Sequence, residues 1–169
     1  MTLRTTRLLI TPIILGLTLT LNTSVASQTT DVAPLVPPNP CEVHLAVGDT
    51  LRFSQTQIDV PQNCERFTVE LEHIGRLPKT ATPQNWVLTT RPYLETVARA
   101  AYRAGEINHW TAPNSEHILA ATPLIGRGET TRVILDVSSL DTETDYRFLS
   151  TVGGHSPRMR GTLRVVPTP

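Results

Sequence analysis

Short stretches of alternating apolar and other residues recur between residues 42 and 166, and they constrain the fold more than any other feature. In residues 42–47 the apolar positions are Val43, Leu45 and Val47, and residues 66–73 alternate in the same way. A period of two predicts half-buried β-strands. Further strand candidates are residues 51–53, 57–60, 86–90, 118–121, 131–137 and 146–150, separated by Gly, Pro and Asp turns. Such a series predicts an all-β sandwich.

One helix is expected within this series, between residues 90 and 105. Thr90 suits an N-cap, Pro92 suits the first turn, and apolar residues recur at helical spacing up to Gly105. We expect its apolar stripe to pack against a sheet. Residues 140–146 resemble a tyrosine corner, in which the Tyr146 hydroxyl ties an arch back to the backbone.

The first residues have the features of a secretory signal peptide. Arg4 and Arg7 precede an apolar run over residues 8–21 and small residues at 24–26, so we expect residues 1–26 to be removed. The run is short for a bilayer, and no cysteine follows closely enough for a lipid anchor. We therefore expect a soluble periplasmic or secreted protein with no membrane anchor after cleavage. Residues 27–40 are proline-rich and predict a linker, residues 41–166 a domain, and residues 167–169 a tail.

Charge and cysteine content narrow the possibilities further. Without the signal peptide the chain has 13 basic and 15 acidic residues, a net charge of −2, which offers no general surface for nucleic acid. Export places Cys41 and Cys64, the only two cysteines, in an oxidising compartment where a disulfide is the default. This pairing leaves no thiol for a metal or a nucleophile.

Residues 150–161 hold the most informative spacing: Ser150, four residues, His155, three residues, Met159. In this stretch the chain resembles the azurins, blue-copper proteins of the cupredoxin family, whose last ligand loop has Cys, His and Met at the same spacing. Residues 83–86 read Pro-Gln-Asn-Trp where azurins have Gly-His-Asn-Trp. The pattern extends from Cys41 to Val166 and implies a cupredoxin-type Greek-key β-sandwich with one inserted helix and one disulfide.

The resemblance also implies a role for each position of a copper site. His155 and Met159 keep ligand residues, whereas Gln84 and Ser150 replace a ligand His and the ligand Cys. The resemblance further places the Pro83 carbonyl at a distant axial position, Asn85 and Thr151 as the cross-link between the two ligand loops, and His73 beside the metal without binding it. The alternation in residues 66–73 likewise points His73 inward, which favours a hydrogen-bonded core histidine.

These substitutions bear directly on copper. A blue-copper centre needs two imidazoles, a thiolate and a weak thioether. A serine hydroxyl stays protonated at neutral pH and binds Cu(I) poorly, so we expect no blue-copper centre and no resident cofactor. Copper remains possible at a soft Cu(I) site built from His155, Met159 and Gln84.

We therefore expect a non-enzymatic binding or interaction module, with a periplasmic protein partner docking near His155. The resemblance implies an apolar docking patch there, where this chain places Leu51, Leu77 and Val152 together with the polar Thr82 and Arg158. The competing class is copper carriage or electron transfer. A hydrolase triad of Ser150, His155 and Asp145 is disfavoured because no Gly-x-Ser-x-Gly elbow surrounds Ser150. Three further histidines, His44, His109 and His117, have no metal-ligand spacing.

Overall fold

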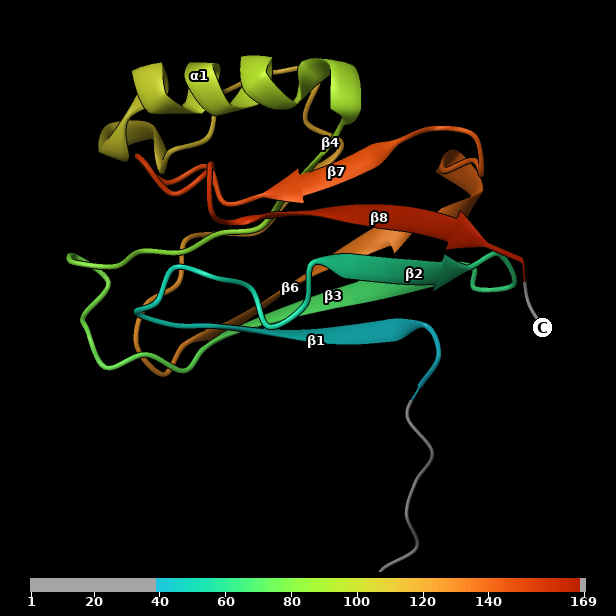
Figure 1. Cartoon of the computed structure of the whole chain (residues 1–169), viewed down its shortest axis with the longest axis horizontal. Helices are drawn as coiled ribbons and strands as arrows, with labels where there is room; N and C mark the ends of the chain where they lie inside the picture. Colours follow the sequence, from blue (N-terminus) through green and yellow to red (C-terminus); the bar gives the residue numbers. More distant parts are fainter. Residues whose placement is uncertain (1–38, 168–169) are drawn as a thin grey trace, which may run out of the picture. The chain divides into compact units, whose positions relative to one another are not determined.

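Two β-sheets make up most of the computed structural model, which describes residues 39–167 (Figure 1). The first sheet has the order β1-β3-β6, formed by Glu42–Val47, Arg66–His73 and Thr130–Asp136. The second has the order β2-β8-β7-β4-β5, formed by Gln57–Pro61, Arg160–Val166, Tyr146–Leu149, Val87–Thr90 and Ala120–Ala121. The chain passes between the two sheets several times, while β4–β5 and β7–β8 remain within the second sheet. The predicted all-β sandwich is confirmed.

The core lies between the sheets and is apolar, as the alternation requires. Leu45, Val69 and Leu71 of the first sheet belong to one buried cluster with Phe148 and Leu163 of the second. The cluster also contains Trp86, whose ring stacks on Phe148 with the ring centroids 5.8 Å apart. Each large apolar side chain removed from water here contributes roughly 2 kcal/mol, so these residues account for much of the stability of the fold.

A single α-helix occurs within the described part of the chain, as predicted, and it covers the second sheet (Figure 1). Helix α1 spans Leu94–Ala104, and its buried residues Val97 and Ala101 lie on the side that faces β4 and β7. Pro92 falls in the short 3-10 segment η1, Arg91–Tyr93, rather than in α1 itself. Thr90 precedes η1 without a side-chain capping bond. Two further 3-10 segments are η2, Glu106–Asn108, and η3, Val137–Ser139.

One strand prediction was wrong, and another was too long. Residues 51–53 form no strand; Phe53 makes an isolated bridge to Val47, and Leu51 has a left-handed φ of 54°, which interrupts an extended chain. Only Ala120 and Ala121 of the predicted strand 118–121 pair with β4. The tyrosine corner is present, because the Asp141 amide donates to the Tyr146 hydroxyl at 3.1 Å.

Four loops gather at one end of the sandwich, which we call the loop end (Figure 1). The strand registers place the end of β1 beside the end of β3 and the start of β6. They also place the start of β4 beside the end of β7 and the start of β8. The connections 48–56, 74–86, 122–129 and 150–159 therefore lie at this end. Two of them carry the predicted ligand positions.

The predicted disulfide joins Cys41 to Cys64, with the Cα atoms 5.6 Å apart. It ties the residue before β1 to the turn between β2 and β3. No helix within residues 39–167 is long and apolar enough to cross a membrane. The predicted signal peptide and residues 27–38 of the predicted linker lie outside the described residues, as do residues 168 and 169.

Candidate functional site

Asn85 joins the two loops that carry the predicted ligand positions. Its side chain is fully buried; its Nδ2 donates to Thr151 Oγ1 at 2.8 Å, and its Oδ1 accepts from the Thr151 amide at 2.9 Å. The same oxygen accepts from the Ser150 hydroxyl at 3.2 Å. Thr151 Oγ1 in turn donates to the carbonyl of Trp110 at 2.5 Å. One buried hydrogen-bonded frame thus holds the 83–85 segment, the start of the 150–159 loop and the segment after α1.

The 150–159 loop folds back on itself, which brings Ser150, His155 and Met159 into one small region. The Ser150 amide donates to the Met159 carbonyl at 2.9 Å, and the Met159 amide donates to the His155 carbonyl at 3.0 Å. Ser150 and Met159 are fully buried, and His155 is half-buried. Burial lowers the pKa of His155 because it disfavours the charged imidazolium. The imidazole is therefore neutral at pH 7 and able to act as a ligand.

Gln84 holds its place through its backbone rather than its side chain. Its amide and carbonyl exchange hydrogen bonds of 2.8 Å with Ile125. The side chain is fully buried, yet neither its Oε1 nor its Nε2 has a hydrogen-bond partner among the protein atoms. Nδ1 of His155 is buried and unpartnered as well. Buried polar atoms are almost always hydrogen-bonded, so these two side chains are the part of the site with unused binding capacity.

His73 lies next to this region as a core histidine. Its side chain is buried, Nδ1 accepts from the Gly75 amide at 3.1 Å, and Nε2 lies 3.1 Å from the Thr82 carbonyl. Because an amide donates to Nδ1 and a carbonyl accepts from Nε2, the ring is neutral with its proton on Nε2. Both ring nitrogens are occupied, so His73 has no free nitrogen for a metal. Pro83, at the predicted axial carbonyl position, is half-buried.

The donor set does not fit a type 1 copper centre. Such a centre requires a thiolate and two imidazoles, and both cysteines of the chain are consumed by the disulfide. Ser150 supplies a neutral hydroxyl that is already bound to Asn85, and Gln84 supplies a neutral amide. Among residues 39–167 no group of three or more His, Cys, Asp and Glu side chains is arranged to hold a metal ion. His155 and Met159 remain as an imidazole and a thioether.

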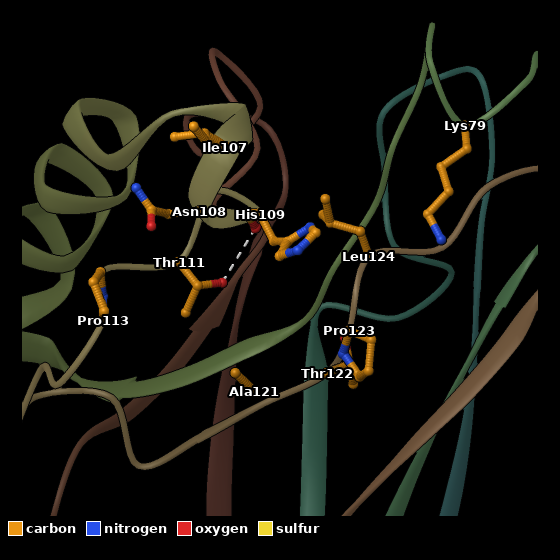
Figure 2. A pocket seen from close by; sticks show the side chains of 10 residues that line it. All are labelled: Lys79, Ile107, Asn108, His109, Thr111, Pro113, Ala121, Thr122, Pro123 and Leu124. Atoms are coloured by element: carbon orange, nitrogen blue, oxygen red, sulfur yellow. Dashed lines mark hydrogen bonds between the residues drawn. The ribbon is translucent and has the colours of Figure 1, made fainter.

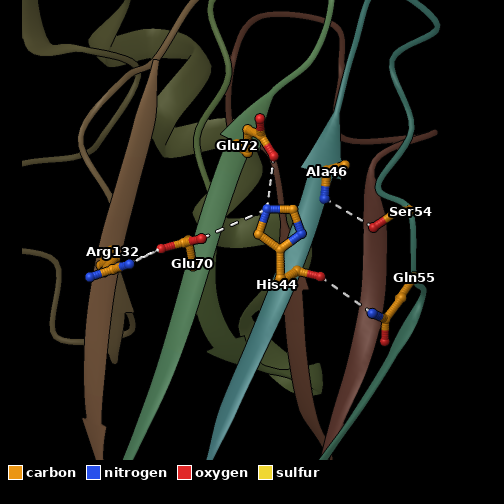
Figure 3. A network of polar contacts seen from close by, with 7 residues as sticks. All are labelled: His44, Ala46, Ser54, Gln55, Glu70, Glu72 and Arg132. Carbon is orange, nitrogen blue, oxygen red and sulfur yellow. Dashed lines mark hydrogen bonds and ion pairs between the residues drawn. The ribbon is translucent and has the colours of Figure 1, made fainter. Parts of the chain in front are cut away.

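A second cluster of titratable groups lies on the outer face of the first sheet (Figure 3). His44 Nε2 is 2.8 Å from Glu72 Oε2 and 3.8 Å from Glu70 Oε1, and Glu70 is also paired with Arg132. His44 and Glu70 are direct neighbours across β1 and β3. Sequence spacing missed this cluster because its members are brought together by strand register. We interpret it as a surface ion-pair network, since Arg132 already neutralises Glu70.

A cavity of about 640 Å³ opens between the segment after α1 and residues 121–124 (Figure 2). Its polar lining includes His109, Thr111 and Lys79, and the Lys79 ammonium is paired with Glu129 at 2.9 Å. None of the predicted ligand positions lines it. His117 is also remote from any ligand set and stacks on Tyr93, with the ring centroids 3.7 Å apart.

The hydrolase triad does not form. Ser150 donates its hydroxyl to Asn85, so no imidazole accepts that proton. Asp145 precedes β7 while Ser150 follows it, and the Asp145 carboxylate is paired with Arg147 at 2.7 Å and with Arg91 at 3.3 Å. Ser150 and the loop that carries His155 therefore lie at one end of β7, and Asp145 lies at the other end.

Sequence reasoning also missed Trp110, which no motif marks. Its carbonyl accepts from Thr151, and its ring fills the space where a side chain at Gly153 would lie, 2.6 Å from the position of a Cβ. Glycine at 153 is thus required by close approach of the indole to the loop. Of the residues of the predicted docking patch, Leu77 is 44% exposed, whereas Val152 and Thr82 are buried.

A β-sandwich with two cross-linked loops of this spacing defines the chain as a cupredoxin-like domain. The family model described as copper binding proteins, plastocyanin/azurin family, matches residues 39–166, and the chain belongs to that family. Azurin iso-2 of Methylomonas sp. strain J is 39% identical over 125 residues, covering 74% of this chain and 97% of the relative. Azurin of Pseudomonas aeruginosa is 37% identical over 123 residues, covering 73% and 83%.

A solved structure agrees with the sequence comparison. The azurin Az-iso2 from the obligate methylotroph Methylomonas sp. strain J superposes with a TM-score of 0.71 at 39% identity, covering 75% of this chain and 98% of that one. The azurin-like fold expected from residues 41–166 is therefore confirmed.

Proposed function

We propose that this chain is an exported azurin-like protein that acts as a periplasmic binding or interaction module and does not transfer electrons through a type 1 copper centre. The observation that carries the proposal is the loss of the thiolate: Ser150 occupies the cysteine position, and the two cysteines of the chain form a disulfide. Without a thiolate the covalency and tuned potential of a blue-copper centre are not available.

The persistence of the loop frame supports a retained surface role for this end of the molecule. Asn85 and Thr151 keep the two loops joined although the ligands at 84 and 150 are replaced. A frame of this kind holds the exposed part of the 150–159 loop in one shape, as binding surfaces require. The partner would be a periplasmic protein that docks near His155.

A second candidate is Cu(I) carriage through His155 and Met159, with Gln84 as a weak third donor. It is favoured by the buried Nδ1 of His155 and the buried amide of Gln84, neither of which has a protein partner. Thioether and imidazole donors suit Cu(I) better than Cu(II). If this second candidate function is correct, the protein carries copper without an intense blue colour.

Metal titration of the mature protein separates the two candidates. Purified protein is titrated with Cu(II) in air and with Cu(I) under anaerobic conditions, and bound metal per chain and the visible spectrum are recorded. The interaction module predicts no binding at micromolar copper and no change in melting temperature. A copper-dependent rise in melting temperature that His155→Ala abolishes would instead establish the carrier.

The double variant Gln84→His/Ser150→Cys provides the matched control for this titration. It restores both lost ligands within the retained frame, so we expect it to bind Cu(II) and develop the intense blue band. A wild-type protein that already shows this band would refute the proposed function. A colourless double variant would show that the frame has lost the geometry of a copper site.

A further inference from the structure

Arginines without an ionic partner gather at the loop end and on α1. Within residues 39–167 the arginines outside the ion pairs are Arg52, Arg66, Arg76, Arg99, Arg103, Arg127 and Arg158. All except Arg66, which begins β3 at the opposite end, lie on α1 or on the loops of the loop end. In the same part of the chain, acidic residues without an ion pair are Glu42, Glu65, Asp136, Asp141 and Glu143 at the opposite end, whereas only Asp49 in the 48–56 loop and Glu106 after α1 lie with the six arginines. The charge is therefore polarised along the sandwich although the mature chain is nearly neutral.

Two of these arginines line a groove between α1 and the 150–159 loop, with a volume of about 410 Å³. Arg99, Tyr102 and Arg103 form its helical wall, and Val152, Gly154 and Pro157 contribute to the opposite wall. Glu95 is the only acidic residue of the lining, and Arg160 neutralises it at 3.0 Å. The exposed Glu106 follows α1 but does not line the groove. The groove thus presents two uncompensated positive charges.

The groove is held in shape by the same frame that joins the ligand loops. Tyr102 is 65% exposed and packs against Trp110, with the ring centroids 6.2 Å apart. Trp110 is fixed by the hydrogen bond from Thr151 and by its close approach to Gly153. The aromatic side of the helix and the loop are therefore positioned together, which lowers the ordering cost of binding.

We propose that this groove binds an extended acidic segment of a protein partner, an inference that rests on the proposed interaction function. Arg99 and Arg103 are one helical turn apart, which separates them by about 6 Å along the axis. Alternate side chains of an extended peptide lie about 6.6 Å apart on one face. Carboxylates at every second position therefore match the two guanidinium groups, which bind carboxylates in a bidentate manner. Apolar lining at Val152 and Pro157 suits apolar side chains of the same segment.

A peptide suits the groove better than a long polyanion. The acidic opposite end would repel a chain of phosphates that extended along the molecule. A short acidic segment contacts only the positive end, and its apolar residues can lie against Tyr102 and Pro157. The position of the groove beside His155 also places such a partner at the predicted docking site.

The test uses the full mature protein, kept free of metal, and a fluorescein-labelled ten-residue peptide in which glutamate alternates with alanine. Fluorescence polarisation at low salt measures its affinity for the wild type and for Arg99→Gln/Arg103→Gln. We expect the double variant to bind about tenfold more weakly and Arg66→Gln, the matched control at the opposite end, to bind like the wild type. Binding of the wild type should also weaken as salt screens the charges.

Three results would overturn the proposal. These are no saturable binding at low salt, equal binding of a peptide with glutamine in place of glutamate, and an equal loss in Arg66→Gln. Tighter binding of inorganic polyphosphate than of the glutamate peptide would assign the groove to phosphate ligands instead. The peptide test uses metal-free protein, so its outcome does not depend on copper. An intense blue band in the copper titration would refute the proposed function but would not decide whether the groove binds acidic peptides. A failed peptide test likewise leaves the metal titration intact.

Discussion

Replacing Asn85 by alanine tests whether this residue still holds the two loops together, although the ligand positions 84 and 150 are substituted. The side chain is fully buried and makes three hydrogen bonds, at 2.8, 2.9 and 3.2 Å, to Thr151 and Ser150. A buried neutral hydrogen bond contributes about 1 kcal/mol, and a partner left unpaired adds to the cost. We expect Asn85→Ala to lower the free energy of unfolding by about 2–4 kcal/mol.

Ser150→Ala is the matched control because it removes only the longest of these bonds. We expect it to cost less than about 1 kcal/mol. Urea unfolding followed by circular dichroism, with the disulfide intact and a chelator present, gives both values, and an unchanged denaturant slope shows that the same surface is exposed on unfolding. The double variant should lose less free energy of unfolding than the sum of the two single losses, because both substitutions remove the same Ser150–Asn85 hydrogen bond. If Asn85→Ala lowers the free energy of unfolding no more than Ser150→Ala does, the two loops are not held together by the Asn85 amide.

Three further outcomes follow from other contacts. A thiol assay on the folded protein should find no free thiol, and Cys41→Ala/Cys64→Ala should lower stability by about 3 kcal/mol, measured by urea unfolding. Gly153→Ala places a methyl group 2.6 Å from the Trp110 ring, and thermal unfolding should show a loss of roughly 1–3 kcal/mol; an unchanged melting temperature would mean that the indole is free to move. Arg147, followed by Arg91, holds the pKa of the Asp145 carboxyl below its usual range. The ionised carboxylate therefore stabilises the fold at pH values above the unfolded-state pKa near 4, and this stabilisation is lost as pH falls through the folded-state pKa. Asp145→Asn should therefore flatten the acid side of the stability profile, and an unaltered slope would contradict this.

The sequence predicted those parts of the fold that depend on local pattern. Residues 66–73 alternate without a break and form β3 with the expected bounds. Residues 51–53 also contain alternating apolar residues, but the left-handed conformation of Leu51 ends the extended chain there. A local pattern does not encode that change of direction, because it follows from the path that the 48–56 loop takes between the two sheets.

The candidate site was predictable where it follows from spacing or from the resemblance to the azurins. Ser150, His155 and Met159 could be grouped because they share one loop. The contribution of Trp110 depends on the segment after α1 reaching Thr151, a contact between residues 41 positions apart. The pairing of His44 with Glu72 likewise requires the register of β1 against β3. Such contacts form only in the tertiary structure, so the spacing of residues along the chain does not predict them.

The two substituted ligand positions are not equivalent in this structure. A serine in a buried site costs about 1–3 kcal/mol when its hydroxyl is unpaired, but Ser150 donates to Asn85, so the frame accommodates it. Gln84 is equally buried, and its amide has no partner among the protein atoms. Gln84, next in sequence to the residue that joins the loops, therefore carries an uncompensated polar side chain, and His155 Nδ1 and Thr82 Oγ1 are further buried atoms without a partner. Any ligand that still binds inside this end of the sandwich should be recognised by Gln84 and His155, and Ser150 should contribute through Asn85 rather than by contact.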